Sequence, residues 1–240
     1  MTKHPTLKAV KISALIADYG APSFRDALAR FIVQFNNTTL TRAHIETQSG
    51  SVALHFNRVP VYHRIKFITE DPYTAGGPED SLLIPYMFSP QKLLGQGKNC
   101  LADSIRHCRV CSMLPADSDS AKGYRVGQVR VIFSLKPHHI QGLFAHGVSP
   151  PQHLAYVEWF SSFTPQPELN HLMYKVKRSL KDGDRMASIV PVANIRRSVY
   201  LLPKFGPVAP LHWTSANVLE ECPTFFVNCF SDRHIYTTLY

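Results

Sequence analysis

The sequence predicts an α+β protein, with N-terminal helices and a β-hairpin followed by a small β-barrel. Two patterns carry this prediction: apolar residues recur with helical spacing before residue 50, and apolar and polar residues alternate in short segments after it. The chain also has 18 Pro against 12 Gly, which favours short elements joined by fixed turns. We expect three parts: a helical piece plus hairpin over residues 1–70, an irregular insertion over 71–121, and a small barrel domain over 122–240.

The first part begins with predicted helices. Apolar residues recur with helical spacing over residues 7–19, and Gly20 suits the end of that helix. The next helix, over 23–35, is strongly amphipathic, and Ser23 can cap its first backbone amides. A shorter helix is expected from Thr41 onward.

After residue 50 the period becomes that of a strand. Residues 51–56 and 59–69 alternate apolar and polar side chains, and we expect them to pair as the hairpin. Residues 70–121 hold turn signals without a sustained pattern. From Tyr124 onward, strand signals bounded by Pro and Gly favour a small barrel or sandwich. These strands are predicted at 126–133, 154–160, 173–178, 187–191, 195–202 and 224–228.

The charge balance favours anionic partners. The formal net charge is +9 at pH 7 with histidine neutral, and 45% of the 240 residues are hydrophobic, enough for a folded core. No stretch approaches the roughly 20 apolar residues of a membrane helix, and no apolar run of signal-peptide type follows the first residues. We therefore expect no membrane partner and a nuclear or cytoplasmic protein.

A basic run in the predicted barrel is the candidate nucleic-acid site. Strand geometry places Lys175 and Lys177 on one face. Side chains of this type neutralise DNA phosphates and release counterions. The alternative is an ordinary solvated sheet face without a ligand. The full predicted set is Lys175, Lys177, Arg178, Lys181, Arg196, Arg197 and Lys204.

An aromatic group is the second candidate site. Tyr156, Trp159 and Tyr174 lie on neighbouring predicted strands and suggest a pocket. Such a cage binds cations, including the modified lysines of histone tails. The alternative is that these rings belong to the core and rim of the barrel.

The sequence offers little for metal binding or catalysis. Cys108 and Cys111 form one CxxC pair with His107 beside it, whereas tetrahedral zinc needs four ligands and no second pair of matching spacing is present. The carboxylates are scattered, and no HExxH, GxSxG or Gly-rich phosphate motif occurs. We expect no metal, no cofactor and no enzymatic activity.

Several strings of this sequence share one resemblance. They are Tyr19–Ile32, Val59–Phe67, Gly123–Val131, Ala155–Phe160, Ile189–Pro191, Ile195–Ser198, Leu202–Gly206 and Phe230–His234. Together they resemble a region near the C-terminus of the long open reading frames of Plavaka-type DNA transposons of mushroom-forming fungi, and the resemblance covers nearly the whole chain. It implies that the acidic, metal-binding transposase core lies upstream in those proteins, so no catalytic residue is carried over here.

The barrel-like half carries a second, more distant resemblance in a Val-Gly-Gln strand, a Trp-Phe strand and a basic strand of the Ile-Pro-x-x-x-Ile type. These strands resemble those of the bromo-adjacent-homology (BAH) domains of chromatin proteins. This second resemblance implies a BAH/SH3-like barrel and concerns the fold alone.

One segment departs from the transposon pattern. Where the relatives carry an apolar strand, this chain has Ala102–Cys108. We hypothesise a local frameshift or misplaced splice near residues 99–116, which the coding DNA tests directly.

These observations favour a non-catalytic, transposon-derived accessory domain that binds DNA or chromatin through a basic barrel face. Two alternatives stay open from the sequence. One is a protein–protein or histone-tail interaction module, and the other is a degenerate fragment without selected activity.

Overall fold

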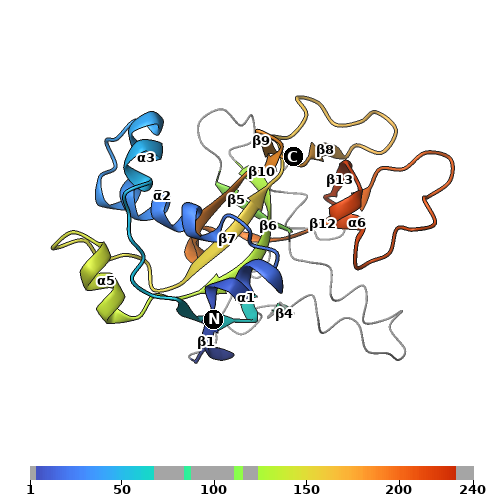
Figure 1. Cartoon of the computed structure of the whole chain (residues 1–240). Coiled ribbons are helices and arrows are strands. Elements are labelled where there is room, and N and C mark those ends of the chain that lie inside the picture. Colours follow the sequence, from blue (N-terminus) through green and yellow to red (C-terminus); the bar gives the residue numbers. More distant parts are fainter. Residues whose placement is uncertain (1–3, 68–83, 88–110, 116–123, 231–240) are drawn as a thin grey trace, which may run out of the picture.

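The computed structural model describes residues 4–67, 84–87, 111–115 and 124–230. It is a mixed α+β structure with antiparallel strand pairing, as the sequence predicts. Figure 1 shows helices α2 and α3 on the left and strands β8, β12 and β13 on the right, with β6 and β7 running between them.

The elements follow one another along the chain with short strands in the majority. In order they are β1 (Leu7–Lys11), α1 (Ile12–Ala17), α2 (Phe24–Asn36), α3 (Arg42–Ser49), β2 (Arg58–Tyr62), β3 (Arg64–Phe67), β4 (Ile84–Met87), β5 (Cys111–Pro115), β6 (Tyr124–Phe133), α5 (Pro137–Leu143), β7 (Leu154–Trp159), β8 (Tyr174–Lys177), β9 (Leu180–Lys181), β10 (Asp184–Arg185), β11 (Ala187–Pro191), the 3₁₀ turn η2 (Val192–Asn194), β12 (Arg197–Pro203), α6 (Val218–Glu221) and β13 (Thr224–Asn228).

Strand β6 organises the main sheet, which has nine strands within the described residues. It pairs with β7 along one edge. Along the other edge, residues 124–128 pair with β5, and Ile132 and Phe133 pair with β2. From β5 the sheet continues through β12 and β13 to β8. β8 meets the end of β7 through a single bridge, Phe160 to Arg178, so the strands that the structure describes do not form a closed barrel.

Three clusters of buried apolar residues stabilise this arrangement. The first joins α1 and α2 to the sheet, where Phe24 contacts Phe133 of β6 and Tyr156 of β7. The second fills the curve of β8, β12 and β13 beneath α6, and the third lies around Ile132 and Val157. The first cluster contains residues from Ile12 to Ile189, so the predicted parts 1–70 and 122–240 share this cluster as well as one sheet.

Two predictions for the first part are wrong. Residues 7–11 form β1 instead of the start of a helix, because they pair with β2, and the helix is limited to Ile12–Ala17. Residues 51–56 form no strand, although Val52, Leu54 and Phe56 do pack against the first cluster. The alternation there reflects burial without strand pairing, and β2 pairs with β1 and β6 instead of forming the predicted hairpin.

Other predictions are confirmed. Helix α2 matches 23–35 within one residue, and the Thr41 side chain accepts a hydrogen bond from the His44 N–H at the start of α3. The predicted cap is wrong: Ser23 occupies the N-cap position of α2, but its side chain makes no cap hydrogen bond and bonds Tyr156 instead. The strand signals after Tyr124 correspond to β6, β7, β8, β11, β12 and β13.

The predicted irregular insertion lies mostly outside the described residues. Within it, β4 pairs with β3, and β5 takes a central place between β6 and β12. Most of residues 99–116, where we hypothesise a frameshift, falls outside the description. Among the residues described, no helix is both long and apolar enough to cross a membrane.

Candidate nucleic-acid interface

Strands β8, β13 and β12 form one end of the main sheet, and this end has one buried and one outer face. Their alternate residues Tyr174, Val176, Leu201, Phe225 and Val227 are buried in the second apolar cluster. The residues between them point to the other side because side chains alternate along a strand. We call this side the basic sheet face; it consists of Lys175, Lys177, Tyr200, Leu202, Lys204, Thr224, Phe226 and Asn228.

The strand register sets two rows on the basic sheet face. Phe226 lies opposite Lys175 on one side and Leu202 on the other. In the next row Thr224 lies opposite Lys177, and its carbonyl accepts the Lys204 N–H at 2.9 Å, which extends the β12–β13 ladder by one residue. Three lysines from two segments about 30 residues apart are thus brought to one surface.

The lysines are close enough to affect one another. Lys175 Nζ lies over the Phe226 ring, 5.9 Å from its centroid, and also contacts Glu168. Partial desolvation and the neighbouring charges of Lys204 and Lys177 lower the pKa of Lys175. A bound anion relieves this repulsion, which is the arrangement expected of a phosphate-binding surface.

The basic sheet face also exposes apolar side chains between its lysines. Tyr200 and Leu202 are each 40% exposed, and Phe205, just beyond β12, is 52% exposed. The His171 ring stands edge-on to Phe226, with 4.3 Å between the ring centroids. Lysines interleaved with aromatic rings offer both phosphate neutralisation and base stacking.

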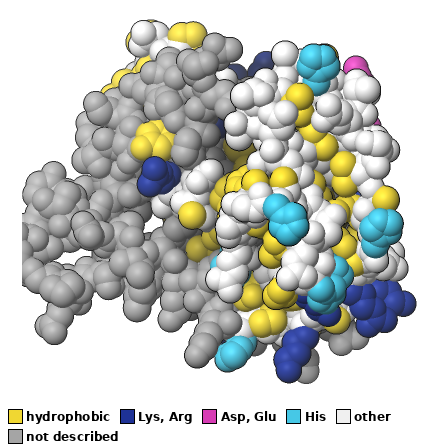
Figure 2. All heavy atoms as spheres, turned by 90° about the vertical axis from the view of Figure 1, so that its left-hand side faces the viewer, with side chains coloured by type: hydrophobic (Ala, Val, Ile, Leu, Met, Phe, Trp, Pro, Cys, Tyr) yellow, Lys and Arg dark blue, Asp and Glu magenta, His cyan; other side chains and the backbone are white. Residues whose placement is uncertain are grey.

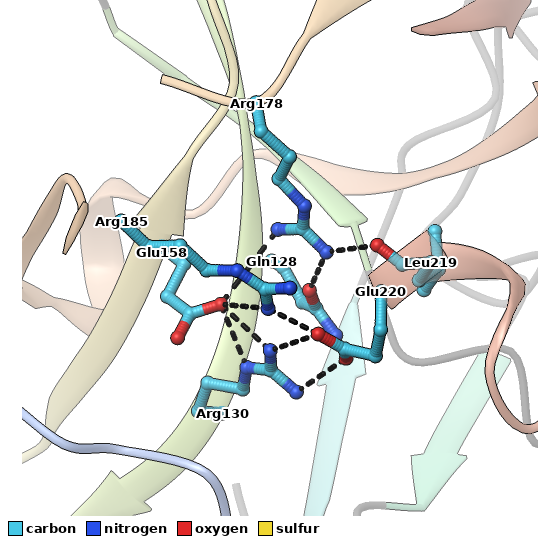
Figure 3. Close-up of polar contacts among 7 residues, drawn as sticks. All are labelled: Gln128, Arg130, Glu158, Arg178, Arg185, Leu219 and Glu220. Carbon is cyan, nitrogen blue, oxygen red and sulfur yellow. Dashed lines mark hydrogen bonds and ion pairs between the residues drawn. The ribbon is translucent and has the colours of Figure 1, made fainter. Parts of the chain in front are cut away.

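The structure separates Arg178 from the basic sheet face. Its guanidinium donates to Gln128 and, at 2.7 Å, to the Leu219 carbonyl (Figure 3). It also lies 3.7 Å from Glu158, and its side chain is 9% exposed. The prediction that Arg178 contacts phosphate is therefore wrong, because this side chain belongs to a buried ion cluster and not to the candidate interface.

That ion cluster joins five parts of the fold: β6, β7, the residue after β8, β10 and α6. Glu158 of β7 is 1% exposed. Its carboxylate forms ion pairs with Arg130 of β6 and Arg185 of β10, with nitrogen–oxygen distances of 2.7 and 3.2 Å. Glu220 of α6 binds the same two arginines (Figure 3). We call Arg130, Glu158, Arg178, Arg185 and Glu220 the buried ion cluster; its contacts hold α6 and the β9–β10 hairpin against the sheet.

The remaining predicted basic residues lie elsewhere. Lys181 is on β9, where its ammonium pairs with Glu46 of α3 at 2.9 Å. Arg196 is exposed just before β12. Arg197 lies in β12 opposite Met113, and its side chain is outside the described structure. Lys175, Lys177 and Lys204 are therefore the predicted residues that the structure brings together.

The predicted aromatic pocket is not assembled. Tyr156 is 1% exposed in the first cluster, Trp159 belongs to the third and Tyr174 to the second. Burial raises the pKa of Tyr156 to about 12, with the nearby Glu158 charge adding to the effect. These rings serve as core, because the strands that carry them curve around different apolar clusters.

A cleft lies on the other side of the molecule, along strand β11. It measures about 930 Å³ and lies between β11, the β9–β10 hairpin and helices α2 and α3. Within the described sheet β11 pairs with β7 alone, so its other edge faces the cleft. Arg125 and Trp159 also line it, and the guanidinium lies 5.0 Å from the ring centroid.

The side that carries α3 and α5 has a different chemistry. Figure 2 shows histidine side chains spread over it, with apolar atoms exposed between them. The histidines on or next to these helices are His44, His55, His138, His139 and His146.

No metal centre is assembled by the part of the chain that the structure describes. No group of three or more His, Cys, Asp or Glu side chains there is placed to hold an ion. Cys108 lies outside the described residues, and of Cys111 only the backbone, in β5, is described. Cys222 and Cys229 are buried in the second apolar cluster, and neither is in a disulfide.

Sequence reasoning missed the apolar part of the basic sheet face. Tyr200, Leu202 and Phe226 read as strand residues, but the lysine run alone did not show which strand would lie beside it. The alternation of 198–204 and 224–228 was the available signal, because it places the even-numbered residues of each strand on one side of that strand. Their pairing with β8 became clear only from the strand register.

The stability of the buried ion cluster depends on pH through Glu220. Burial by itself raises the pKa of this carboxyl, but hydrogen bonds and charges from Arg130 and Arg185 outweigh it and lower the pKa to about 2. A depressed folded-state pKa stabilises the fold above the ordinary value of 4.5, and this stabilisation is lost as pH falls toward 2.

We therefore expect Glu220→Gln to reduce the dependence of stability on pH between 4.5 and 2. Urea unfolding at several pH values measures it. At pH 7 the variant is less stable than the wild type, and the difference narrows on acidification. A constant difference across this range contradicts the assignment.

Comparison with known proteins gives no match to this chain among protein-family models, curated proteins or solved structures. Function is therefore inferred from the geometry of its surfaces.

Proposed function

We propose that this chain is a non-catalytic accessory domain of transposon origin that binds DNA through the basic sheet face. The observation that carries the proposal is the placement of Lys175, Lys177 and Lys204 around exposed apolar side chains on one sheet. A net charge of +9 adds long-range attraction to a polyanion. The transposon origin is supported by the sequence resemblance alone.

The BAH-like architecture is part of the same proposal. Its support is the path β6–β5–β12–β13–β8, which turns back on itself until Phe160 and Arg178 form a bridge. The Ser161 N–H donates to the Lys177 carbonyl at 2.7 Å, and the Ser179 N–H donates to the Trp159 carbonyl at 3.0 Å. These bonds bring β8 back beside the end of β7, as an incompletely closed barrel requires.

A DNA-binding titration over a salt series tests the proposed function. We expect the logarithm of the association constant to fall linearly with that of the salt concentration, because phosphate neutralisation releases counterions. Lys177→Ala and Lys204→Ala should each weaken binding on all sequences alike and reduce the salt slope by about 1. Fluorescence anisotropy with labelled oligonucleotides between 50 and 200 mM salt, roughly the range over which such contacts weaken, gives both quantities.

Lys181→Ala is the matched control. It removes the same charge from the chain, but this ammonium pairs with Glu46 beside α3 and lies outside the basic sheet face. The control should leave the salt slope unchanged. Binding that does not depend on salt, or that Lys181→Ala weakens as much as Lys177→Ala does, contradicts the proposal.

Protein binding is the second candidate function, and the cleft along β11 is the observation that favours it. An extended peptide adds to an exposed strand edge through backbone hydrogen bonds. The histone-tail form of this alternative lacks its cage, since Tyr156, Trp159 and Tyr174 lie in separate clusters. A proline replacing Ala187 removes an N–H from β11; loss of a protein partner with DNA binding intact would favour this function.

A further inference from the structure

We propose that the basic sheet face selects single-stranded DNA over duplex DNA, with Tyr200 as the ring on which a base stacks. This inference rests on the proposed function and specifies its ligand. The observation behind it is an exposed aromatic and aliphatic strip, Tyr200 and Leu202, that runs along β12 beside the lysines. Paired bases in a duplex keep their faces stacked on one another, so only unpaired bases can use such a strip.

Phosphate contact and base stacking, the two interactions needed for this binding, use different strands of the face. Lys175 and Lys177 lie on β8 and are about 7 Å apart along the strand, since successive residues rise 3.2–3.4 Å. Tyr200 and Leu202 lie on β12, two strands away across β13. Neighbouring strands are about 4.8 Å apart, so β8 and β12 are within reach of one nucleotide chain that lies on this face. Its phosphates then contact the lysines of β8 while its bases stack on the apolar side chains of β12.

Of the two rings that the paired strands place on this face, Tyr200 and Phe226, Tyr200 is the more available for stacking. Its side chain is 40% exposed. Phe226 is already contacted by the His171 ring and by Lys175 Nζ. We therefore assign Phe226 to holding Lys175 in place, and Tyr200 to the base itself.

The face is also poorly suited to reading a duplex. Direct readout needs a helix or a two-stranded ribbon that enters the major groove. The basic sheet face presents the broad side of three strands, and the lysines on it come from β8 and from the end of β12. This face is therefore better shaped to contact the phosphates of a single nucleic-acid strand than to enter the groove of a duplex.

The experiment compares three labelled 20-nucleotide probes of one mixed sequence: single-stranded DNA, its blunt duplex and the corresponding single-stranded RNA. Anisotropy titrations use the full chain and four variants, Tyr200→Ala, Tyr200→Phe, Lys177→Ala and Leu180→Ala. Leu180 is 60% exposed on β9 and serves as the apolar control away from the face. Tyr200→Ala should weaken single-strand binding about 5- to 150-fold, while Tyr200→Phe keeps it, because stacking needs the ring and not the hydroxyl.

The outcomes distinguish the two claims. Tighter binding of single-stranded DNA than of the duplex, lost in Tyr200→Ala and kept in Tyr200→Phe and Leu180→Ala, supports the inference. Equal binding of strand and duplex, a Tyr200→Ala variant like the wild type, or a preference for RNA overturns it. If Lys177→Ala also has no effect on any probe, the proposed function fails as well, and not just its single-stranded form.

Discussion

Replacing Glu158 by glutamine should destabilise the protein by about 3–5 kcal/mol, because it removes the buried carboxylate beside Arg130, Arg178 and Arg185. Glu158 is 1% exposed, and its Oε2 atom accepts from Arg130 at 2.7 and 3.0 Å and from Arg185 at 3.2 Å. Glutamine keeps the size of the side chain, so the loss comes from charge and not from a cavity. Urea unfolding followed by circular dichroism measures the change in the free energy of unfolding.

Glu46→Gln is the matched control for this prediction. The chemical change is the same, but Glu46 is 36% exposed and pairs with Arg30 and Lys181 at the surface. Surface pairs contribute about 0–1 kcal/mol, so this variant should stay close to the wild type. If the two variants lose equal stability, the buried ion cluster does not hold α6 and the β9–β10 hairpin as described.

Phe24→Ala should cost about 3–5 kcal/mol, because it empties a fully buried position between helix and sheet. Phe24 of α2 is 0% exposed, and its ring centroid lies 5.0 Å from that of Phe133 on β6. Since the N-terminal helices share this cluster with β6, β7 and β11 of the main sheet, the variant should unfold earlier as a single unit. Tryptophan fluorescence from Trp159 and Trp213, which lie outside the first cluster, should shift together with the circular dichroism signal.

Phe205→Ala is the control, since that ring is 52% exposed and its loss should change stability by less than about 0.5 kcal/mol. If fluorescence stays unchanged while the helical signal of Phe24→Ala melts early, the N-terminal helices form a separate unit. A broad, non-cooperative transition in the wild type itself supports the alternative of a degenerate fragment.

The sequence predicted elements best where one pattern matched one environment. Helix α2 buries a single stripe, and its apolar spacing reveals both its type and its ends. β1 was misassigned because short apolar spacings fit either a helix or a strand, and only pairing partners decide between them. Residues 51–56 were misassigned because their alternation reflects burial in the first cluster without strand pairing. Turn chemistry at Asp182–Gly183, both at positive φ, could have identified the β9–β10 hairpin from its Asp-Gly signal.

The candidate interface was predictable only in part. Parity along one strand correctly placed Lys175 and Lys177 together. Proximity in sequence was misleading for Arg178 and Lys181, because the chain turns after β8 and directs them to Glu158 and Glu46. Lys204 and Tyr200 join the face through strand register, which depends on the whole sheet and cannot be read from any one segment.

Lysine protection measured by mass spectrometry tests the location of DNA binding most directly. The protein is acetylated briefly with and without saturating single-stranded DNA, and the reactivity of each lysine is compared. Lys177 and Lys204 should become protected, whereas Lys8 and Lys181, exposed but off the basic sheet face, should react as before. Protection of Lys181 with continued reactivity of Lys204 would contradict the assignment of DNA binding to this face.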